Sequence, residues 1–202
     1  MQKLNTGYYK TFAAFSFMLM ISSCSNTKFL QEGQMLYTGA KITVKNDTLS
    51  KKEKSNLKDA LQEQLRPKPN SSFLGLRPRL YVYNITKEPK KQKGIGYWLK
   101  YKIGEKPVLL GDVDREFNKK IIVNYSENKG FFNAEASSDT IAKNKKAQVL
   151  YTVKPGARYL ISQVNFPVDS TVINSEIQSI KDKSFLKAGN PFDLDVIKAE
   201  RE

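Results

Sequence analysis

The sequence predicts an α+β fold in which strands and amphipathic helices follow one another in a repeating order. Three observations predict it. Leucines recur at every fourth position between residues 57 and 65, which is the spacing of a helix with one buried face. Val149, Tyr151 and Val153 recur at every second position, as on the buried face of a strand. The segments follow the order strand, helix, helix, strand, strand, and the start of this order then recurs.

The first strand and the first helix have clear boundary signals. A strand is expected over residues 35–44, where apolar residues fall on one face. Ser50 and Glu53 form the pattern of a capping box, in which each side chain accepts a hydrogen bond from the other residue's backbone N–H. The helix that begins there is expected to end before Pro67. Residues 70–84 mix glycine and proline with large apolar residues, and they predict neither a helix nor a strand.

A second helix and a hairpin complete the first copy of the order. Residues 112–129 predict a helix with Asp112 as its N-cap and Gly130 as its left-handed stop. A polar strand is expected over residues 134–142, followed after a turn by the apolar strand around residues 149–153. Apolar residues recur at every fourth position along the helix: Val113, Phe117, Ile121 and Tyr125.

The second copy is incomplete in this sequence. A strand with one slip in its alternation is expected over residues 159–166, which is consistent with a bulge. A helix is expected over residues 170–182, and Asp193 is expected to cap another helix that starts at Leu194. The chain stops at Glu202, about two turns into that helix, so the sequence is expected to be a fragment or to carry an unfinished last element.

The N-terminus has the layout of a secretory signal peptide. A weakly basic start precedes an apolar run over residues 11–21, which is about half the length needed to span a bilayer. The run ends in Ser22-Ser23-Cys24, and Cys24 is the sole cysteine. A branched apolar residue, two small residues and a cysteine resemble the bacterial lipobox, which implies cleavage before Cys24 and acylation of its thiol and new amine. The alternative is an ordinary signal sequence with a chance cysteine.

The lipobox resemblance also implies a location. Several acyl chains on Cys24 would hold the mature N-terminus stably in a membrane, because one chain alone holds only marginally. Ser25 follows the cysteine where an aspartate would favour the inner membrane, so the implied destination is the outer membrane. No acidic cluster follows, which favours a periplasmic rather than a surface orientation.

Composition excludes several classes of function. The chain holds 34 Lys and Arg against 20 Asp and Glu, a net charge of +14, and +12 remains without residues 1–23. Such a charge favours anionic surfaces, but an exported chain is not expected to bind nucleic acid. The sequence has no histidine, which excludes imidazole catalysis and metal sites that need His. We therefore expect no enzymatic activity, no cofactor and no metal.

Two features of the middle region leave alternatives open. Residues 87–93 form a basic loop, which is either a solvated charged segment or a contact for lipid. The chain's positive charge as a whole has the same two interpretations, since a lipid-tethered domain lies close to a leaflet. Four aromatic residues either pack in a core or line a pocket: Tyr81, Tyr83, Tyr97 and Trp98.

Three short motifs occur in a fixed order near the end of the chain. Residues 128–134 carry glycine, two aromatics and a small residue. Residues 153–161 carry Gly156 followed by an aromatic and then an aliphatic residue, and residues 189–193 read Gly-Asn-Pro-Phe-Asp. In this order they resemble the junctions of POTRA domains, the βααββ modules that precede the membrane barrel in BamA- and TamA-type outer-membrane assembly proteins.

A lipobox ahead of such modules is similar to the TamL-like lipoproteins of Bacteroidota. This resemblance implies the following organisation: a signal peptide over residues 1–23, a tether over residues 24–34, a first POTRA-like module over residues 35–156 with an insertion at about 70–103, and an incomplete second module over residues 157–202.

The resemblance implies a periplasmic region that handles unfolded outer-membrane protein precursors by strand addition, since an extended chain can pair with an open sheet edge. Further implied partners are outer-membrane lipid, through Cys24, and an inner-membrane TamB-like protein. One alternative is that the insertion at 70–103 caps the edge. Another is a free-standing lipoprotein that serves as a binding module. The polar strand is the expected edge, with four candidate residues: Ala134, Ala136, Ser138 and Thr140.

Overall fold

The computed structural model describes residues 26–166 and 171–201. The expected signal peptide and the candidate lipidation residue Cys24 lie outside these residues. The strands are β1 (Leu36–Val44), β2 (Glu135–Lys143) and β3 (Lys146–Lys154). The helices are α2 (Lys51–Gln64), α3 (Pro78–Ile85), α4 (Ile95–Trp98), α5 (Arg115–Asn128), α6 (Val172–Ile180) and α7 (Leu194–Glu200), with short helical turns η1 (Asn26–Phe29), η2 (Leu99–Ile103), η3 (Leu110–Asp112) and η4 (Lys181–Lys183).

The three strands form one sheet in the order β1-β3-β2. β1 runs parallel to β3, because Leu36 N donates to Lys145 O at 2.9 Å and Lys45 N donates to Val153 O at 2.8 Å. β2 and β3 form a hairpin whose two turn residues have φ of +52° at Asn144 and +57° at Lys145, as a type I′ turn requires. The predicted α+β class is confirmed, and β1, α2, α5, β2 and β3 follow the predicted order, with α3 and α4 as additional helices between α2 and α5.

The chain divides into two compact units, each described here by itself. The first contains the described part of residues 1–39 together with residues 67–113 and 142–148. The second contains residues 40–66, 114–141 and the described part of 149–202. Strand β1 and the β2–β3 hairpin contribute residues to both units.

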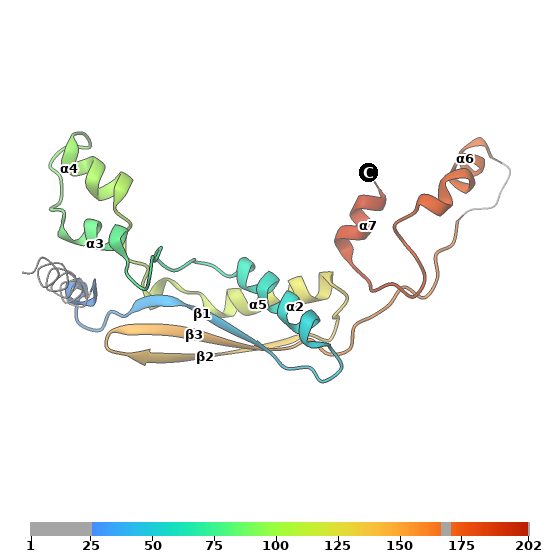
Figure 1. Cartoon of the computed structure of the whole chain (residues 1–202), viewed down its shortest axis with the longest axis horizontal. Coiled ribbons are helices and arrows are strands. Elements are labelled where there is room, and N and C mark those ends of the chain that lie inside the picture. The colour runs from blue at the N-terminus through green and yellow to red at the C-terminus, as the bar shows by residue number, and fades with distance from the viewer. Residues whose placement is uncertain (1–25, 167–170, 202) are drawn as a thin grey trace, which may run out of the picture. The chain divides into compact units, whose positions relative to one another are not determined.

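The second unit contains the larger core. Helices α2 and α5 lie side by side on one face of its strands (Figure 1). Leu57 and Leu61 on α2 are buried, as their spacing of four residues predicts. The capping box is formed, with Glu53 Oε2 accepting from Ser50 N at 2.9 Å and Ser50 Oγ accepting from Glu53 N at 3.3 Å. The sheet supplies alternating buried residues: Ile42, Val149, Tyr151 and Val153.

Helix α5 starts later than its sequence predicts. Asp114 rather than Asp112 is its N-cap, and its Oδ1 accepts from Phe117 N at 2.9 Å. Asp112 instead accepts from Leu109 N at 2.8 Å within the preceding 3-10 turn, because Leu109–Asp112 form a tight turn of their own. From the sequence, Asp112 and Asp114 are equally suitable as the N-cap of this helix. Only the 3-10 turn that engages Asp112 leaves Asp114 as the N-cap.

The buried face of α5 is offset by one residue from the predicted apolar repeat. Phe117 is 54% exposed, whereas Asn118, Ile122 and Ser126 are fully buried. Asn118 is buried because its side chain pairs with the backbone of Arg66: its Oδ1 accepts from Arg66 N at 3.0 Å and its Nδ2 donates to Arg66 O at 2.6 Å. Ser126 Oγ donates to Ile122 O at 2.8 Å, which satisfies the hydroxyl inside the helix.

The first unit contains residues 70–103, the segment expected to be an insertion and called the insertion below. It has a small core of Leu30, Leu36 and Leu80, with Leu109 packed against it. Leu80 lies on α3, a helix that sequence reasoning missed because Pro78 and Gly75 suggest an irregular segment. Pro78 in fact starts the helix, where its missing N–H costs nothing. Residues 26–29, expected to belong to a tether, form η1, and Leu30, which follows directly, belongs to this core.

The end of the chain differs in part from its prediction. Residues 159–166 form no regular strand, and Leu160 instead makes an isolated bridge with Pro191. A strand needs hydrogen-bond partners along its whole length. Among the described residues, the segment 159–166 pairs with residues 189–192 at Tyr159 and Ile161 only, so no regular strand forms. The two expected helices are present as α6 and α7, and Asp193 caps α7 by accepting from Asp195 N at 3.0 Å.

Candidate functional site

The predicted edge strand lies at the margin of the sheet. In the order β1-β3-β2, strand β2 pairs with β3 on one side only. Ala136, Ser138 and Thr140 lie within β2, and Ala134 lies one residue before it. These side chains are half-buried, while Glu135, the neighbouring residue, is exposed, so the alternation of a two-faced strand is present.

The hairpin register determines which backbone groups face outward. β2 and β3 are joined by a two-residue turn, so Lys143 and Lys146 form the hydrogen-bonded pair next to it. Hydrogen-bonded and non-hydrogen-bonded pairs then alternate along an antiparallel ladder. The N–H and C=O groups of Ala136, Ser138 and Thr140 are therefore directed away from β3, along the open margin of the sheet.

One outward group is already occupied by a neighbouring side chain. Asp139 Oδ1 accepts from Thr140 N at 2.7 Å, and Arg115 Nη1 donates to Thr140 Oγ1 at 3.3 Å. Charged side chains on an edge strand are a common protection against unwanted pairing. An incoming strand would have to displace the Asp139 carboxylate to reach the Thr140 N–H.

The opposite margin of the sheet is covered at the start of β1. Leu36 makes an antiparallel bridge with Leu109, and Tyr37 N donates to Val108 O at 2.9 Å. Asn70 holds this segment, because its Oδ1 accepts from Val108 N at 2.9 Å and its Nδ2 donates to Lys106 O at 2.7 Å. The segment that follows the insertion thus pairs with the first residues of β1 only. Among the described residues, β2 has no strand neighbour on its outer side along its whole length.

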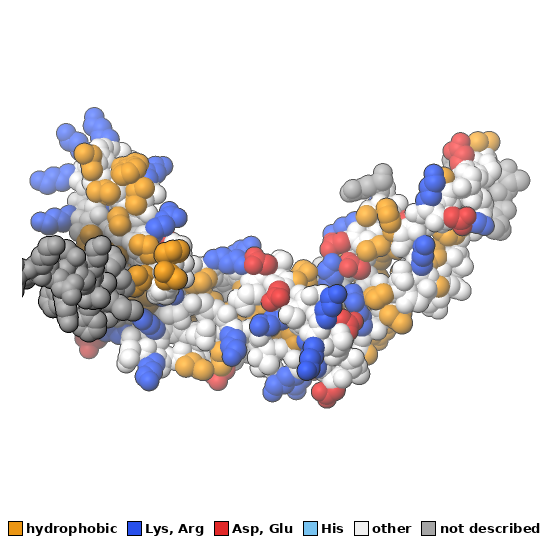
Figure 2. All heavy atoms as spheres, viewed as in Figure 1, with side chains coloured by type: hydrophobic (Ala, Val, Ile, Leu, Met, Phe, Trp, Pro, Cys, Tyr) orange, Lys and Arg blue, Asp and Glu red, His pale blue; other side chains and the backbone are white. Residues whose placement is uncertain are grey.

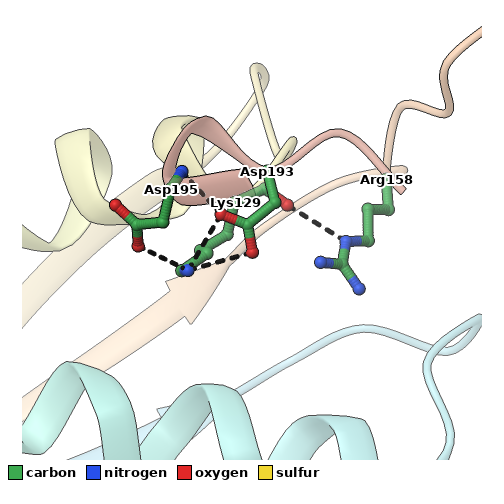
Figure 3. A network of polar contacts seen from close by, with 4 residues as sticks. All are labelled: Lys129, Arg158, Asp193 and Asp195. Atoms are coloured by element: carbon green, nitrogen blue, oxygen red, sulfur yellow. Dashed lines mark hydrogen bonds and ion pairs between the residues drawn. The ribbon is translucent and has the colours of Figure 1, made fainter. Parts of the chain in front are cut away.

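A second polar site lies where α5 ends, and Figure 3 shows it with Lys129 between two carboxylates. Lys129 Nζ lies 3.0 Å from Asp193 Oδ2 and 2.8 Å from Asp195 Oδ2. Arg158 Nε donates to the Lys129 carbonyl at 3.0 Å. Sequence reasoning missed this network, because Lys129 and Asp193 are far apart in the chain and no local pattern links them.

The network shifts the pKa values of its members. Burial works against the charged form of Lys129, but hydrogen bonds to Asp195 and Asp193 outweigh it and raise the pKa of the ammonium. The hydrogen bond from Lys129 lowers the pKa of the exposed Asp195 carboxyl. Both directions favour the ion-paired state near neutral pH.

The motifs that carry the POTRA resemblance meet at this site. Tyr159 N donates to Gly130 O at 2.8 Å, and Phe192 N donates to Tyr159 O at 2.9 Å. The Phe132 ring lies 5.2 Å from the Tyr159 ring and 5.0 Å from the Phe192 ring. Gly130 has φ +87°, and a Cβ there would lie 2.8 Å from Phe192 O, so only glycine allows this approach.

The aromatic residues of the insertion form neither a core nor an enclosed pocket. The rings of Tyr97 and Tyr101 are tilted against each other with their centres 5.0 Å apart, and with the basic loop they line a surface cavity of about 460 Å³. Trp98 is 53% exposed, so core packing is wrong for this residue. Within the described ranges, no helix is both long and apolar enough to cross a membrane, and no cluster of acidic residues could hold a metal ion.

No protein-family model matches the chain, and no curated protein matches it. Among solved structures, the chain is similar to the crystal structure of POTRA domains 3–5 of BamA from Haemophilus influenzae, over 85% of each chain, at 14% sequence identity and a TM-score of 0.27. The α+β assignment therefore rests on the strand order and helices of this chain itself.

Proposed function

We propose that this chain is the periplasmic region of a TamL-like lipoprotein and that it handles unfolded outer-membrane protein precursors by strand addition to β2. The observation that carries the proposal is the open margin of β2, where the outward N–H and C=O groups of Ala136, Ser138 and Thr140 have no neighbouring strand among the described residues. Backbone pairing tolerates many sequences, which suits a factor that receives many clients.

Cys24 is the proposed lipidation residue, and the outer membrane, with the domain in the periplasm, is the proposed location. The apolar run over residues 11–21 and the Ser-Ser-Cys sequence support this. Labelled palmitate should be incorporated into the native protein and lost in Cys24→Ser. A TamB-like protein of the inner membrane is a further proposed partner, and co-purification from crosslinked cells tests it.

The strand-addition proposal has a direct backbone test. Ser138→Pro removes one outward N–H, and proline is tolerated at an edge position whose N–H faces away from the ladder. Ser138→Ala changes the side chain but keeps the N–H, so it is the matched control. The probe is a synthetic extended peptide with alternating apolar and polar residues, and its binding is measured by fluorescence anisotropy.

We expect Ser138→Pro to weaken peptide binding several-fold, and Ser138→Ala to leave it close to that of the native chain. Asp139→Ala should strengthen binding, because it removes the carboxylate that occupies the Thr140 N–H. In cells, a photocrosslinker at the exposed residue Ser137 should capture barrel precursors. Equal binding by the proline and alanine variants would show that the peptide uses another surface.

A further inference from the structure

The insertion of the first unit concentrates positive charge. Residues 70–106 contain nine Lys and Arg and two Glu, a net charge of +7, which is half of the +14 of the whole chain. Both glutamates are engaged locally: Glu88 accepts from the Tyr101 hydroxyl, and Glu105 accepts from Ser71. The exposed cations of this segment are Arg79, Lys87, Lys90, Lys91, Lys93, Lys102 and Lys106.

Large apolar side chains are exposed among these lysines. Ile95 is 79% exposed and Trp98 is 53% exposed, and both lie on α4. Figure 2 shows hydrophobic side chains gathered over α3 and α4, with Lys and Arg side chains around them. Exposed apolar groups rimmed by polar residues mark interaction sites, and tryptophan in particular favours the boundary between lipid and water.

Around α4, a lysine side chain is buried while two large apolar side chains are exposed. Lys100, on the π-helical turn η2 that continues α4, is 8% exposed. Its Nζ donates to Thr86 O at 2.9 Å, lies 4.6 Å from the centre of the Tyr83 ring and lies 3.4 Å from Glu88 Oε2. Burial of a lysine is costly unless it is paired in this way. The helix thus covers a charged side chain and exposes Ile95 and Trp98, which is the reverse of a water-facing amphipathic helix.

The insertion is attached to the start of the described chain. Asn26 Nδ2 donates to Arg77 O at 3.3 Å, and Leu30 packs against Leu80 of α3. Cys24 precedes Asn26 by two residues, so the two Cα atoms lie within about 7 Å of each other. An acyl group on Cys24 would therefore keep the insertion close to the surface of the bilayer.

We propose that the insertion is a membrane-binding surface, in which Ile95 and Trp98 enter the headgroup region and the surrounding lysines contact anionic lipid phosphates. Charge complementarity selects an anionic leaflet, because each Lys or Arg near such a surface favours binding. The inference rests on the lipid anchor of the proposed function and adds a second point of attachment. One lipid anchor combined with a basic surface holds a protein more firmly than either alone.

The test uses residues 24–202 with Cys24→Ser, which carry no lipid, and vesicles of phosphatidylcholine with or without phosphatidylglycerol. Trp98 is the sole tryptophan of the chain, so its emission reports on this surface directly. We expect a blue shift with the anionic vesicles, reversal of the shift by added salt, and no shift with phosphatidylcholine alone. Sedimentation with the vesicles gives the affinity.

Charge reversal separates this surface from the net charge of the chain. Lys90→Glu with Lys91→Glu should weaken vesicle binding by about tenfold or more. Lys181→Glu with Lys183→Glu changes the net charge equally at exposed positions in η4, so it is the matched control and should have a much smaller effect. Ile95→Ser with Trp98→Ser, at two exposed positions, should also reduce sedimentation while the circular dichroism spectrum stays unchanged.

Three results would overturn the proposal: no binding to anionic vesicles, binding without a blue shift, or an equal loss in both charge-reversal variants. None of them bears on the anchor or on the peptide-binding edge. Palmitate labelling tests the anchor in the native protein, and Ser138→Pro tests the edge without vesicles. A result that contradicts membrane binding by the insertion is therefore distinguishable from one that contradicts the proposed function.

Discussion

Lys129 and Asp193, 64 residues apart in the sequence, form an ion pair of 3.0 Å that joins the end of α5 to the start of α7. Both side chains are mostly buried, and the Lys129 ammonium also reaches Asp195. The pair acts together with the Tyr159–Gly130 and Phe192–Tyr159 hydrogen bonds. It attaches the C-terminal segment to the strand-and-helix module that precedes it.

Asp193→Asn should loosen this attachment without unfolding α7. An asparagine oxygen still caps the helix, but the charge that pairs with Lys129 is lost. We expect the attachment to weaken by about 1 kcal/mol, as for other partly buried ion pairs. The measurement is hydrogen exchange at the Tyr159 and Phe192 amides. Asp182→Asn, at an exposed position in η4, is the control, and an equal effect there would contradict the role of the pair.

The same network makes the attachment depend on pH in two directions. The lowered pKa of Asp195 means that its contribution is present above the ordinary aspartate pKa and is lost as pH falls through the depressed value. The raised pKa of Lys129 means that its contribution is present below the ordinary lysine pKa and is lost as pH rises through the raised value. Exchange at Phe192, corrected for intrinsic rates, should be slowest between these limits. An exchange rate at Phe192 that changed in one direction only with pH would contradict the role of Lys129 and Asp195 in this attachment.

The C-terminal segment should exchange its amide protons faster than the sheet. Between residues 156 and 201, leaving aside 167–170 and Ile173, no side chain is buried, whereas Val149, Tyr151 and Val153 in β3 are at most 1% exposed. Regions with few buried apolar contacts open at low free energy. Exchange followed by mass spectrometry should resolve the two regions. Equal protection of both would mean that the segment has a core that the structure does not show.

Asn118→Ala should destabilise the chain by about 1–3 kcal/mol, because it removes both hydrogen bonds that the buried Asn118 side chain makes with the Arg66 backbone. Denaturation by urea measures the effect. Asn124→Ala lies on the same helix at an exposed position, so its effect should stay within about 0.5 kcal/mol. A small effect at Asn118 would show that water replaces the lost amide.

Leu74→Asn should stabilise the chain by up to about 1 kcal/mol. Leu74 has φ +48° and is 87% exposed, and it precedes Gly75 at φ +78°, so the substitution produces the Asn-Gly pair that a type I′ turn favours. Gly75→Ala should instead destabilise the chain, because alanine is strained at this φ. No atom lies within 4 Å of the added Cβ, so the effect reports on the backbone alone. Thermal denaturation compares the two variants, and a shared sign would contradict the backbone argument.

Local signals were sufficient for the elements whose cause is local. Ser50 and Glu53 satisfy each other's backbone groups within one turn, so the start of α2 can be predicted from four residues. The alternation in β3 likewise reflects burial that repeats along the strand itself. Helix α3 was missed because Pro78 is equally compatible with a loop, and only the burial of Leu80 against Leu30 and Leu36 decides the case.

The remaining features depend on contacts between distant segments. The buried face of α5 includes Asn118, whose polarity argues against burial until its partner Arg66 is known. The edge position of β2 could be predicted from its polar character. The hydrogen bond from Thr140 N to the Asp139 carboxylate could not be predicted, because several other groups near Asp139 in the sequence could equally donate to it. The ion pair of Lys129 joins segments that no periodicity connects.

The Asp139 carboxylate, which accepts from the Thr140 N–H, would also act on any pairing of two copies of the chain through β2. Two β2 strands that paired antiparallel about this residue would set two carboxylates face to face, and like charges directly opposite in a ladder are destabilising. A foreign strand with a neutral or basic residue at that place encounters no such repulsion. Pairing of two copies in this register is thereby disfavoured, whereas a foreign strand has only to displace the Asp139 carboxylate from the Thr140 N–H.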